Sequence, residues 1–479
     1  MPLRLARLFA LLLGVVLLPA TTAARETIPA DDPQPRYLVL CVDGIGYDLV
    51  EEMYRRGELR HFHSPIPLIA PFPTVTNLGL VETLAPLGAP PARGYEDYYF
   101  DPAANHMRGG FFHRFRRNSF VAGSYREMFH YHPHPIAMTL EYALPVLGPW
   151  IGGRISLSRI KRKFLKSREP VFLAYLDSTD PGAHISGKWL LRHLLRRVDR
   201  LAGQLRKARV PVEVVVFSDH GNQFSKFRKV NLAKPLKRAG FRVQSKLTHP
   251  PSVVIPRYGL VGAAVLYTQA GREPAVAEAV RAAPGVDLVA YRTAEGVQVL
   301  SREGRALILR RGPAYRYLPQ SGDPLALHPI AEDLPADSEG FSHEDDWLAA
   351  TADHIYPDPL RRLWFAFESL VKQPASVIVS LEDGYYTGSA VLDFFSFLFL
   401  RATHGNLRRT QSLAFAMSTA DFLTPPRKAE ANDSNPLAFN RSAVPRALRT
   451  RDLWLLLARQ TSRPLRPSRC PTFLHTAHP

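Results

Sequence analysis

Cysteine is almost absent from this chain: only Cys41 and Cys470 occur among 479 residues. Two cysteines so far apart exclude a disulfide framework and a zinc cluster built on cysteine thiolates. A metal site would therefore need histidine and carboxylate ligands, and the chain has 17 histidines that could serve.

Long hydrophobic runs are scarce as well. Leu8–Leu18 and Val391–Leu400 both fall short of the roughly 20 residues that a membrane-spanning helix needs. Arg4 and Arg7 precede the first run, and small residues ending at Ala24 follow it. This order is typical of a secretory signal peptide cleaved after Ala24. We expect an exported protein, periplasmic or extracellular, although an uncleaved anchor or a buried helix would give a similar pattern.

Acidic residues are in deficit, since 43 Asp+Glu stand against 61 Lys+Arg and the formal net charge is +18. Such a chain suits anionic partners. No basic motif interleaved with aromatic residues is present, so a specific nucleic-acid module is not expected.

The basic segment 426–479 is expected to be poorly packed apart from a helix over 451–460, and it could contact an anionic membrane. The basic face at 192–207 is interpreted as a solvated helix face. The sequence does not indicate an oligomeric state.

Apolar residues make up 46% of the chain, which excludes extensive disorder. Four continuous apolar runs have the length of strands buried on both faces: Tyr37–Val42, Val171–Leu176, Val212–Phe217 and Ser376–Leu381. Helical patterns accompany them, including an amphipathic helix over 188–209 and a helix over 358–371 that begins with Asp and Pro. This alternation predicts an α/β fold with a mainly parallel central sheet flanked by helices. Short alternating segments predict a small α+β insertion at about 250–325, within a main domain of residues 25–425.

Acidic residues stand directly after three of these strands: Asp43, Asp177 with Asp180, and Asp219. Ligand sites of open α/β sheets lie beyond the carboxyl ends of the strands, so these carboxylates are expected to converge. Converging carboxylates repel one another unless cations neutralise them. His184, His220 and His404 are the histidines placed to join them. Mixed histidine and carboxylate ligands suit zinc best, and manganese or another divalent ion would also fit.

The segment around Thr76 offers a candidate nucleophile. Pro71 and Pro73 fix the backbone ahead of a helix start, and a hydroxyl there lies among free N–H groups at the positive end of the helix dipole. That environment stabilises an alkoxide and a phosphate. The alternative is that Thr76 merely caps the helix, because threonine is a common N-cap.

These motifs, taken in order, resemble the alkaline phosphatase superfamily, and most closely its type I phosphodiesterase/nucleotide pyrophosphatase branch. The resemblance covers about residues 36–420. It rests on the following stretches: Asp43-Gly44, Phe72 to Thr76, Asp180 with His184, Asp219-His220-Gly221, and His404-Gly405.

The resemblance implies an exported hydrolase of phosphodiester or pyrophosphate bonds with two zinc ions. One metal would be held by Asp180, His184 and His404. The other would be held by Asp43, Asp219, His220 and the oxygen of Thr76. Thr76 would be the nucleophile, because metal coordination lowers the pKa of a hydroxyl, and Thr74 is the less favoured choice. The substrate would be a small anionic ester, either a nucleotide or a phospholipid derivative.

The sequence departs from the family at one substrate-binding position. Relatives carry an Asn that hydrogen-bonds a phosphate oxygen, whereas Asp97 or Tyr98 stands nearest to that position here. An ionised Asp97 would repel phosphate, Tyr98 could donate a hydrogen bond, and Asn77 could substitute. A phosphomonoesterase that binds phosphate through Arg93 or Arg108 therefore remains an alternative.

A catalytically inactive metal-binding or membrane-binding relative is a further alternative. Three other residues have no ligand role in this interpretation. Asp177 is either a support for the site or a turn residue, and His132 and His343 are treated as non-ligands.

Overall fold

The computed structural model describes residues 35–110, 124–133, 141, 144, 146–208, 211–257, 259–389, 400–421 and 448–460. The predicted signal peptide, most of the apolar run 391–400 and the tail segments 422–447 and 461–479 lie outside these residues. Within the described part of the chain, no helix is long and apolar enough to cross a membrane.

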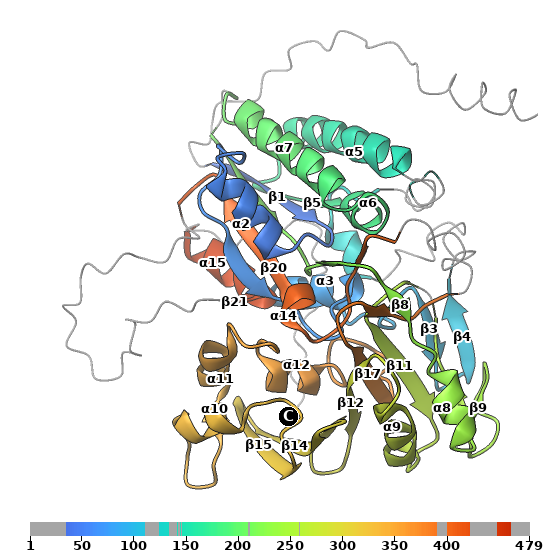
Figure 1. Cartoon of the computed structure of the whole chain (residues 1–479). Helices are drawn as coiled ribbons and strands as arrows, with labels where there is room; N and C mark the ends of the chain where they lie inside the picture. Colours follow the sequence, from blue (N-terminus) through green and yellow to red (C-terminus); the bar gives the residue numbers. More distant parts are fainter. Residues whose placement is uncertain are drawn as a thin grey trace, which may run out of the picture. The chain divides into compact units, whose positions relative to one another are not determined.

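A six-stranded sheet contains three of the four predicted apolar strands (Figure 1). In sheet order its strands are β21 (Leu448–Arg449), β2 (Ile66–Ile69), β20 (Leu413–Ser418), β6 (Val212–Phe217), β1 (Arg36–Val42) and β5 (Val171–Leu176). β1 pairs in parallel with β5 and β6, and only β20 runs against its neighbours. The predicted α/β class with a mainly parallel central sheet is therefore confirmed.

Helices cover both faces of this sheet: α2 (Tyr47–Arg55), α5 (Leu147–Lys166) and α7 (Lys188–Leu205) on one face, α3 (Thr76–Leu84) and α15 (Leu453–Gln460) on the other. Successive strand residues point to opposite faces. Leu38 and Leu40 of β1 accordingly pack with the first set, and Val39 and Cys41 with the second. A strand covered on both faces is apolar at every position, which is why the sequence revealed it.

The fourth predicted strand belongs to a second, nine-stranded sheet instead. In sheet order this sheet contains β16 (Ser342–His343), β15 (Ala314–Ser321), β14 (Gly304–Arg311), β13 (Val297–Ser301), β12 (Val286–Arg292), β17 (Val377–Leu381), β11 (Ala263–Thr268), β10 (Ser252–Val254) and β9 (Arg242–Val243). β17 pairs antiparallel with β11 and β12. The insertion is thus larger than the expected span of 250–325, because an apolar run shows that a strand is buried but not which sheet it joins.

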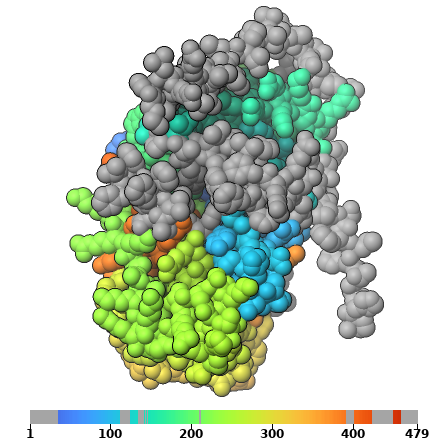
Figure 2. All heavy atoms as spheres, turned by 90° about the vertical axis from the view of Figure 1, so that its right-hand side faces the viewer, coloured from blue at the N-terminus to red at the C-terminus, as the bar shows by residue number. Residues whose placement is uncertain are grey.

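The remaining elements are short. They are η1 (Ala85–Leu87), β3 (Tyr98–Asp101), β4 (His106–Gly109), η3 (Tyr125–Met128), α6 (Thr179–Ser186), β7 (Gln223–Phe224), β8 (Arg228–Lys229), α8 (Ala233–Arg238), α9 (Glu273–Arg281), α10 (His328–Asp333), α11 (Glu344–Thr351), α12 (Pro359–Phe365), β18 (Tyr385–Tyr386), β19 (Ala402–Thr403), α14 (Arg409–Ser412) and η4 (Thr450–Asp452). The β3–β4 hairpin, cyan in Figure 2, is joined to the segment before β10 by a hydrogen bond from the Asn105 amide to the Leu247 carbonyl, 3.0 Å long.

Helix α12 is shorter than the sequence predicted. It begins at Pro359 as expected, but it ends at Phe365 rather than near Val371. Ser369 adopts a φ of +52°, a conformation that no helix continues through. Asp358 does not cap the helix with its side chain, because that carboxylate accepts a hydrogen bond from Arg449 Nε at 2.8 Å.

Part of the tail that was expected to be poorly packed is integrated into the fold. β21 extends the central sheet beside β2, and Leu453, Trp454 and Leu457 of α15 are buried in the core. Their spacing places the three side chains on one helix face, which outweighs the basic and polar composition of the surrounding segment.

A buried ion pair fixes helix α3, which carries Thr76. Glu82 of α3 accepts hydrogen bonds from Arg361 Nη1 at 2.7 Å and from Thr450 Oγ1 at 2.8 Å. All three side chains are buried, and removing Glu82 takes from Arg361 its closest carboxylate and leaves the longer pair with Glu344 at 3.3 Å. The contacts connect α3 to α12 and to the residues just after β21.

We predict that Glu82→Ala lowers the free energy of unfolding by about 3 kcal/mol, the lower end of the cost of breaking a buried ion pair, because Arg361 keeps its pair with Glu344. Urea denaturation of the purified chain measures it. Glu278→Ala is the matched control, because its pair with Arg281 lies at the surface and should contribute at most about 0.5 kcal/mol. Equal effects of the two substitutions would contradict the prediction.

Candidate active site

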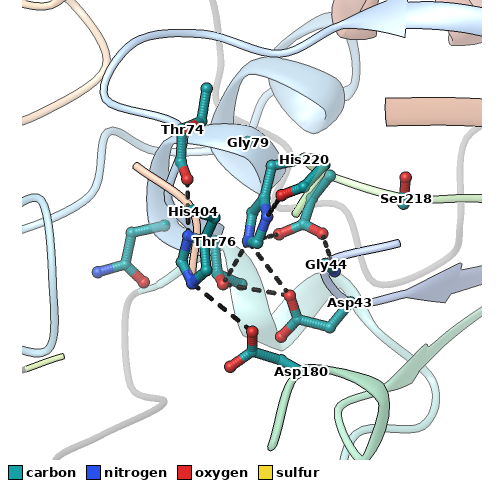
Figure 3. A network of polar contacts seen from close by, with 12 residues as sticks. Asp43, Gly44, Thr74, Thr76, Gly79, Asp180, Ser218, His220 and His404 are labelled. Carbon is teal, nitrogen blue, oxygen red and sulfur yellow. Dashed lines mark hydrogen bonds and ion pairs between the residues drawn. The ribbon is translucent and has the colours of Figure 1, made fainter. Parts of the chain in front are cut away.

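Three buried carboxylates meet beyond the carboxyl ends of β1, β5 and β6 (Figure 3). Asp43 follows β1, Asp219 follows β6, and Asp180 lies in the first turn of α6 after β5. The Nε2 atom of His220 lies 3.5 Å from Asp43 Oδ1 and 3.5 Å from Asp219 Oδ2. The sheet therefore brings together residues that are far apart in sequence, as expected for strand-end ligands.

Three histidines turn Nε2 toward this cluster and Nδ1 toward the backbone. The Nδ1 atoms of His184, His220 and His404 lie 2.8, 2.9 and 2.8 Å from the backbone carbonyls of Ala402, Gly221 and Thr74, respectively. A carbonyl only accepts, so each Nδ1 carries a proton, which leaves Nε2 as the nitrogen that could bind a cation. A ligand histidine fixed through its second nitrogen is a regular feature of metal sites.

The Nε2 atoms face the carboxylates. Asp180 Oδ1 lies 3.2 Å from His184 Nε2 and 3.6 Å from His404 Nε2. Two groups of ligand atoms, each lying within 4.8 Å of one another, could hold a cation: Asp180 with His184 and His404, and Asp43 with Asp180 and His220. The first group is the set that the sequence suggested for one metal. In the second group Asp180 takes the place expected for Asp219.

Asp219 remains close to the second group. Its Oδ1 accepts from the Gly44 amide at 3.1 Å. Its Oδ2 is fully buried and has no hydrogen-bond partner in the described part of the chain. A buried carboxylate oxygen aimed at histidine nitrogens fits a cation ligand, since an unpaired buried polar atom is otherwise costly. The donor set fits zinc or a similar divalent ion.

The electrostatics of the cluster show the same lack of positive charge. Burial, followed by the charges of Asp219 and Asp180, raises the pKa of Asp43 well above its ordinary value. Burial and then the neighbouring His220 lower the pKa of His404 well below its ordinary value. Burial opposes ionisation of Asp180 too, but His184 and His404 outweigh it and lower the pKa of that carboxyl. A bound cation would favour the ionised carboxylates and neutral imidazoles together.

The hydroxyl of Thr76 faces this cluster from the start of α3. Thr76 Oγ1 lies 3.3 Å from Asp43 Oδ1 and 3.4 Å from His220 Nε2. The N-cap position belongs to Val75, so Thr76 is not the helix cap that the sequence left open. Thr74 is fully buried, where its hydroxyl donates to Asn406 O and accepts from Gly405 N. Thr76 is therefore the hydroxyl available to the site.

Two glycines permit this close arrangement. Gly44 has a φ of +63°, and a Cβ there would lie 2.8 Å from the Asn222 amide nitrogen and 3.2 Å from Asp180 Oδ1. A Cβ on Gly79 of α3 would lie 2.6 Å from the carbonyl oxygen of Asp219. Neither position has room for a side chain, so helix α3 and the end of β6 are held in direct contact.

A pocket of about 160 Å³ adjoins helix α3. It is lined by Asn77, Arg93, Asp97, Tyr99, Arg108 and Arg126 among others. Tyr98 is not among the lining residues, because consecutive residues of a strand face opposite sides and Tyr99 is the one turned inward. Arg108 Nε lies 2.6 Å from Asp101.

Asp97 does not stand as an isolated negative charge. Its Oδ1 lies 3.4 Å from both terminal nitrogens of the buried Arg126. Arg126 and Tyr125 also donate to Asn77 Oδ1, at 3.3 and 2.7 Å. Tyr125 and Arg126 therefore hold the side chain of Asn77 in place. The guanidinium of Arg126 offsets the repulsion that Asp97 was expected to exert on a phosphate.

Sequence reasoning missed several residues that support the site. Tyr175 of β5 donates its hydroxyl to Asp43 Oδ2, and the Asn222 amide donates to Gly44 O. The signal for Tyr175 was a tyrosine within an apolar strand, because a buried phenol needs a partner. Arg126 gave no signal, since it lies outside every predicted element.

The residues treated as uncertain lie apart from the two ligand groups. Asp177 is buried after β5, and its charge contributes to raising the pKa of Asp43. His132 Nδ1 lies 3.0 Å from the Pro133 carbonyl, and His343 accepts from the Asp345 amide at the start of α11. Neither histidine belongs to a metal-binding group in the described residues.

Comparison with solved structures finds similar chains among ectonucleotide pyrophosphatase/phosphodiesterases. The murine enzyme 5 is 14% identical, with 80% of this chain and 87% of that chain covered and a TM-score of 0.42. An inactive variant of the murine enzyme in complex with AMP is 15% identical, with 80% of this chain and 88% of that chain covered and a TM-score of 0.43. The human enzyme 5 is 16% identical, with 80% and 87% covered and a TM-score of 0.42. No protein-family model and no curated protein sequence matches the chain.

We predict that the purified chain binds about two divalent ions and that His184→Ala reduces this to about one, because it removes a ligand from only one group. Metal content after dialysis against zinc, measured by plasma mass spectrometry, tests this. His343→Ala should leave the content unchanged. Wild-type protein without bound metal would overturn the assignment of both groups.

Proposed function

We propose that this protein is a metal-dependent hydrolase of phosphoric esters, acting on diesters or pyrophosphates through Thr76. One observation carries the proposal: a hydroxyl at a helix start lies within 3.4 Å of both a carboxylate and a histidine of a buried, carboxylate-rich cluster. That arrangement combines a nucleophile, ligands for cations and the N–H groups of a helix terminus at one point.

The geometry of the cluster supports the ligand sets that the resemblance implies, with Asp180 also within reach of the second group. Asp180, His184 and His404 would hold one ion, and Asp43, Asp219, His220 and the Thr76 oxygen would hold the other. Zinc suits these donors best. When bound, the ions supply positive charge that lowers the pKa of a coordinated hydroxyl and stabilises negative oxygens on phosphorus.

The residues of the chain account for the rest of the reaction. The Thr76 hydroxyl directs its proton toward Asp43 Oδ1, 3.3 Å away. Its oxygen forms a bond to phosphorus as the bond from phosphorus to the leaving oxygen breaks, and the proton released by Thr76 ends on the leaving alcohol. Water then attacks phosphorus, the bond to Oγ1 breaks, and the proton that the water gives up restores the threonine hydroxyl. The N–H groups in the first turn of α3 face the phosphoryl oxygens throughout.

The pocket beside α3 would receive the substrate. Arg126 is a buried cation of its lining, and it donates to the side chain of Asn77, the residue next to Thr76. The lining carries three arginines, Arg93, Arg108 and Arg126, against the two carboxylates Glu96 and Asp97, so a small anionic ester such as a nucleotide or a phospholipid derivative would suit it. A monoesterase is the second candidate function, favoured by the arginines that line the pocket. Export with cleavage after Ala24 also belongs to the proposal, and N-terminal sequencing of secreted protein tests it.

We predict that Thr76→Ala lowers kcat/KM for bis-p-nitrophenyl phosphate by about 10⁴-fold or more, because it removes the nucleophile. Thr76→Ser is the matched variant, since it keeps the hydroxyl and should retain substantial activity. A chelator should abolish wild-type turnover, and zinc should restore it.

The same assay with p-nitrophenyl phosphate separates the two candidate functions. Faster diester than monoester hydrolysis is the expected result, and the reverse preference would move the function to a phosphomonoesterase. Undiminished turnover in Thr76→Ala would contradict the nucleophile assignment. Bound metal without turnover of either ester would indicate the inactive relative instead.

We predict that Arg126→Gln raises KM for an anionic diester about tenfold, the loss expected for one charge-assisted contact. A change of kcat alone would contradict a binding role. Arg281→Gln, which removes a surface guanidinium outside the pocket, should leave KM unchanged.

A further inference from the structure

Helix α5 exposes large apolar side chains toward solvent. Leu147, Ile151 and Ile155 are 59%, 39% and 39% exposed and follow one another at four-residue intervals. Leu144 and Val146, just before the helix, are exposed as well. A helix of a soluble protein usually turns such residues toward the core. This row therefore forms an apolar stripe on the surface.

The stripe continues onto α7, which packs beside α5 (Figure 1). Trp189, near the start of α7, is 59% exposed. Trp150 of α5 and Trp189 both contact the ring of His193, with centroids 6.2 and 6.1 Å away. Indole rings combine an apolar body with one polar N–H, the combination that favours a membrane–water interface.

Basic residues share this surface. Helical periodicity places three exposed arginines on the same face of α5 as the apolar stripe: Arg154, Arg159 and Arg162. The 20 residues of α5 contain six Lys or Arg and neither Asp nor Glu. Burial and the combined charge of Arg154 with the arginines of α7 lower the pKa of His193, which shows that positive charge is concentrated here. Part of α5 is visible at the surface in teal (Figure 2).

We propose that α5 and the start of α7 form a docking surface for an anionic lipid bilayer. Apolar side chains and a tryptophan would enter the interface, and the surrounding arginines would contact lipid phosphates. An acidic protein or nucleic acid would match the charge but would leave the aliphatic stripe in water. This inference differs from the expected contact through the basic tail, and it does not depend on the proposed hydrolysis.

The docking surface adjoins the candidate active site along the chain. α6 carries Asp180 and His184. Gly187 alone separates α6 from α7, and Trp189 is the second residue of α7. Docking would therefore bring the site close to lipid headgroups.

The test uses the fluorescence of Trp189. The chain has five tryptophans, and Trp347, Trp364 and Trp454 are buried. The full-length protein is mixed with vesicles of phosphatidylcholine alone or with 30% phosphatidylglycerol, about the proportion that gives a strongly anionic surface, and with brominated acyl chains as quenchers. We expect quenching with the anionic vesicles, and Trp189→Phe should clearly reduce it, with the half-buried Trp150 of the same surface giving the remainder.

Two sets of variants separate the charge from the apolar contact. Arg154→Gln with Arg162→Gln should weaken partitioning by roughly tenfold or more, as expected for two interfacial charges. Leu147→Ser with Ile151→Ser should weaken it at constant charge. Lys237→Gln with Arg238→Gln on α8 and Ile355→Ser are matched exposed controls that should change nothing.

Three outcomes would overturn the proposal. The first is equal quenching of wild type and Trp189→Phe. The second is binding that the α8 controls weaken as much as the α5 variants do. The third is binding of an acidic polymer such as heparin without any quenching by brominated lipid, which would assign the surface to a macromolecular polyanion.

Discussion

Repulsion among Asp43, Asp180 and Asp219 is the constraint on which the rest of this structure depends. The parallel strands bring the three carboxylates to one buried point, where the low dielectric strengthens their mutual repulsion. The described residues place three imidazoles there and fix each through a backbone carbonyl, so that the Nε2 atoms face the same point. Bound cations would offset the repulsion, which is the physical basis of the metal-dependent chemistry proposed above.

The proposed nucleophile, Thr76, is held by a second set of contacts. Helix α3 touches the end of β6 through Gly79, and the buried pair of Glu82 and Arg361 connects the helix to α12. The hydroxyl of Thr76 is thereby positioned by backbone packing and by an ion pair more than one helical turn away. Positioning of this kind is what makes a weak nucleophile effective, because small displacements at a reacting atom cost large factors in rate.

Much of this arrangement could be predicted from the sequence, for a physical reason. Strands such as Val171–Leu176 are buried on both faces, so their apolar runs have sharp ends, and polar residues just beyond those ends fall at the ligand-binding edge. The sequence did not predict which sheet β17 joins, because burial leaves no mark of the pairing partner. It also missed Arg126, whose role arises only from a tertiary contact with Asp97, and it underestimated α15, whose apolar face stands within a basic segment.

The pairing of β21 with β2 has a consequence for how the chain is made. A ribosome delivers β2 nearly 380 residues before β21, and domains fold as they emerge, at about 5–20 residues per second. For that interval the edge of the central sheet is open, and Glu82 gains Arg361 only after about residue 361 has been made and Thr450 only after β21. The nascent chain thus holds an unpaired strand edge until β21 is made. Chaperone binding to the growing polypeptide would be most needed during that interval, and a message truncated before codon 448 would yield a product that never closes this edge.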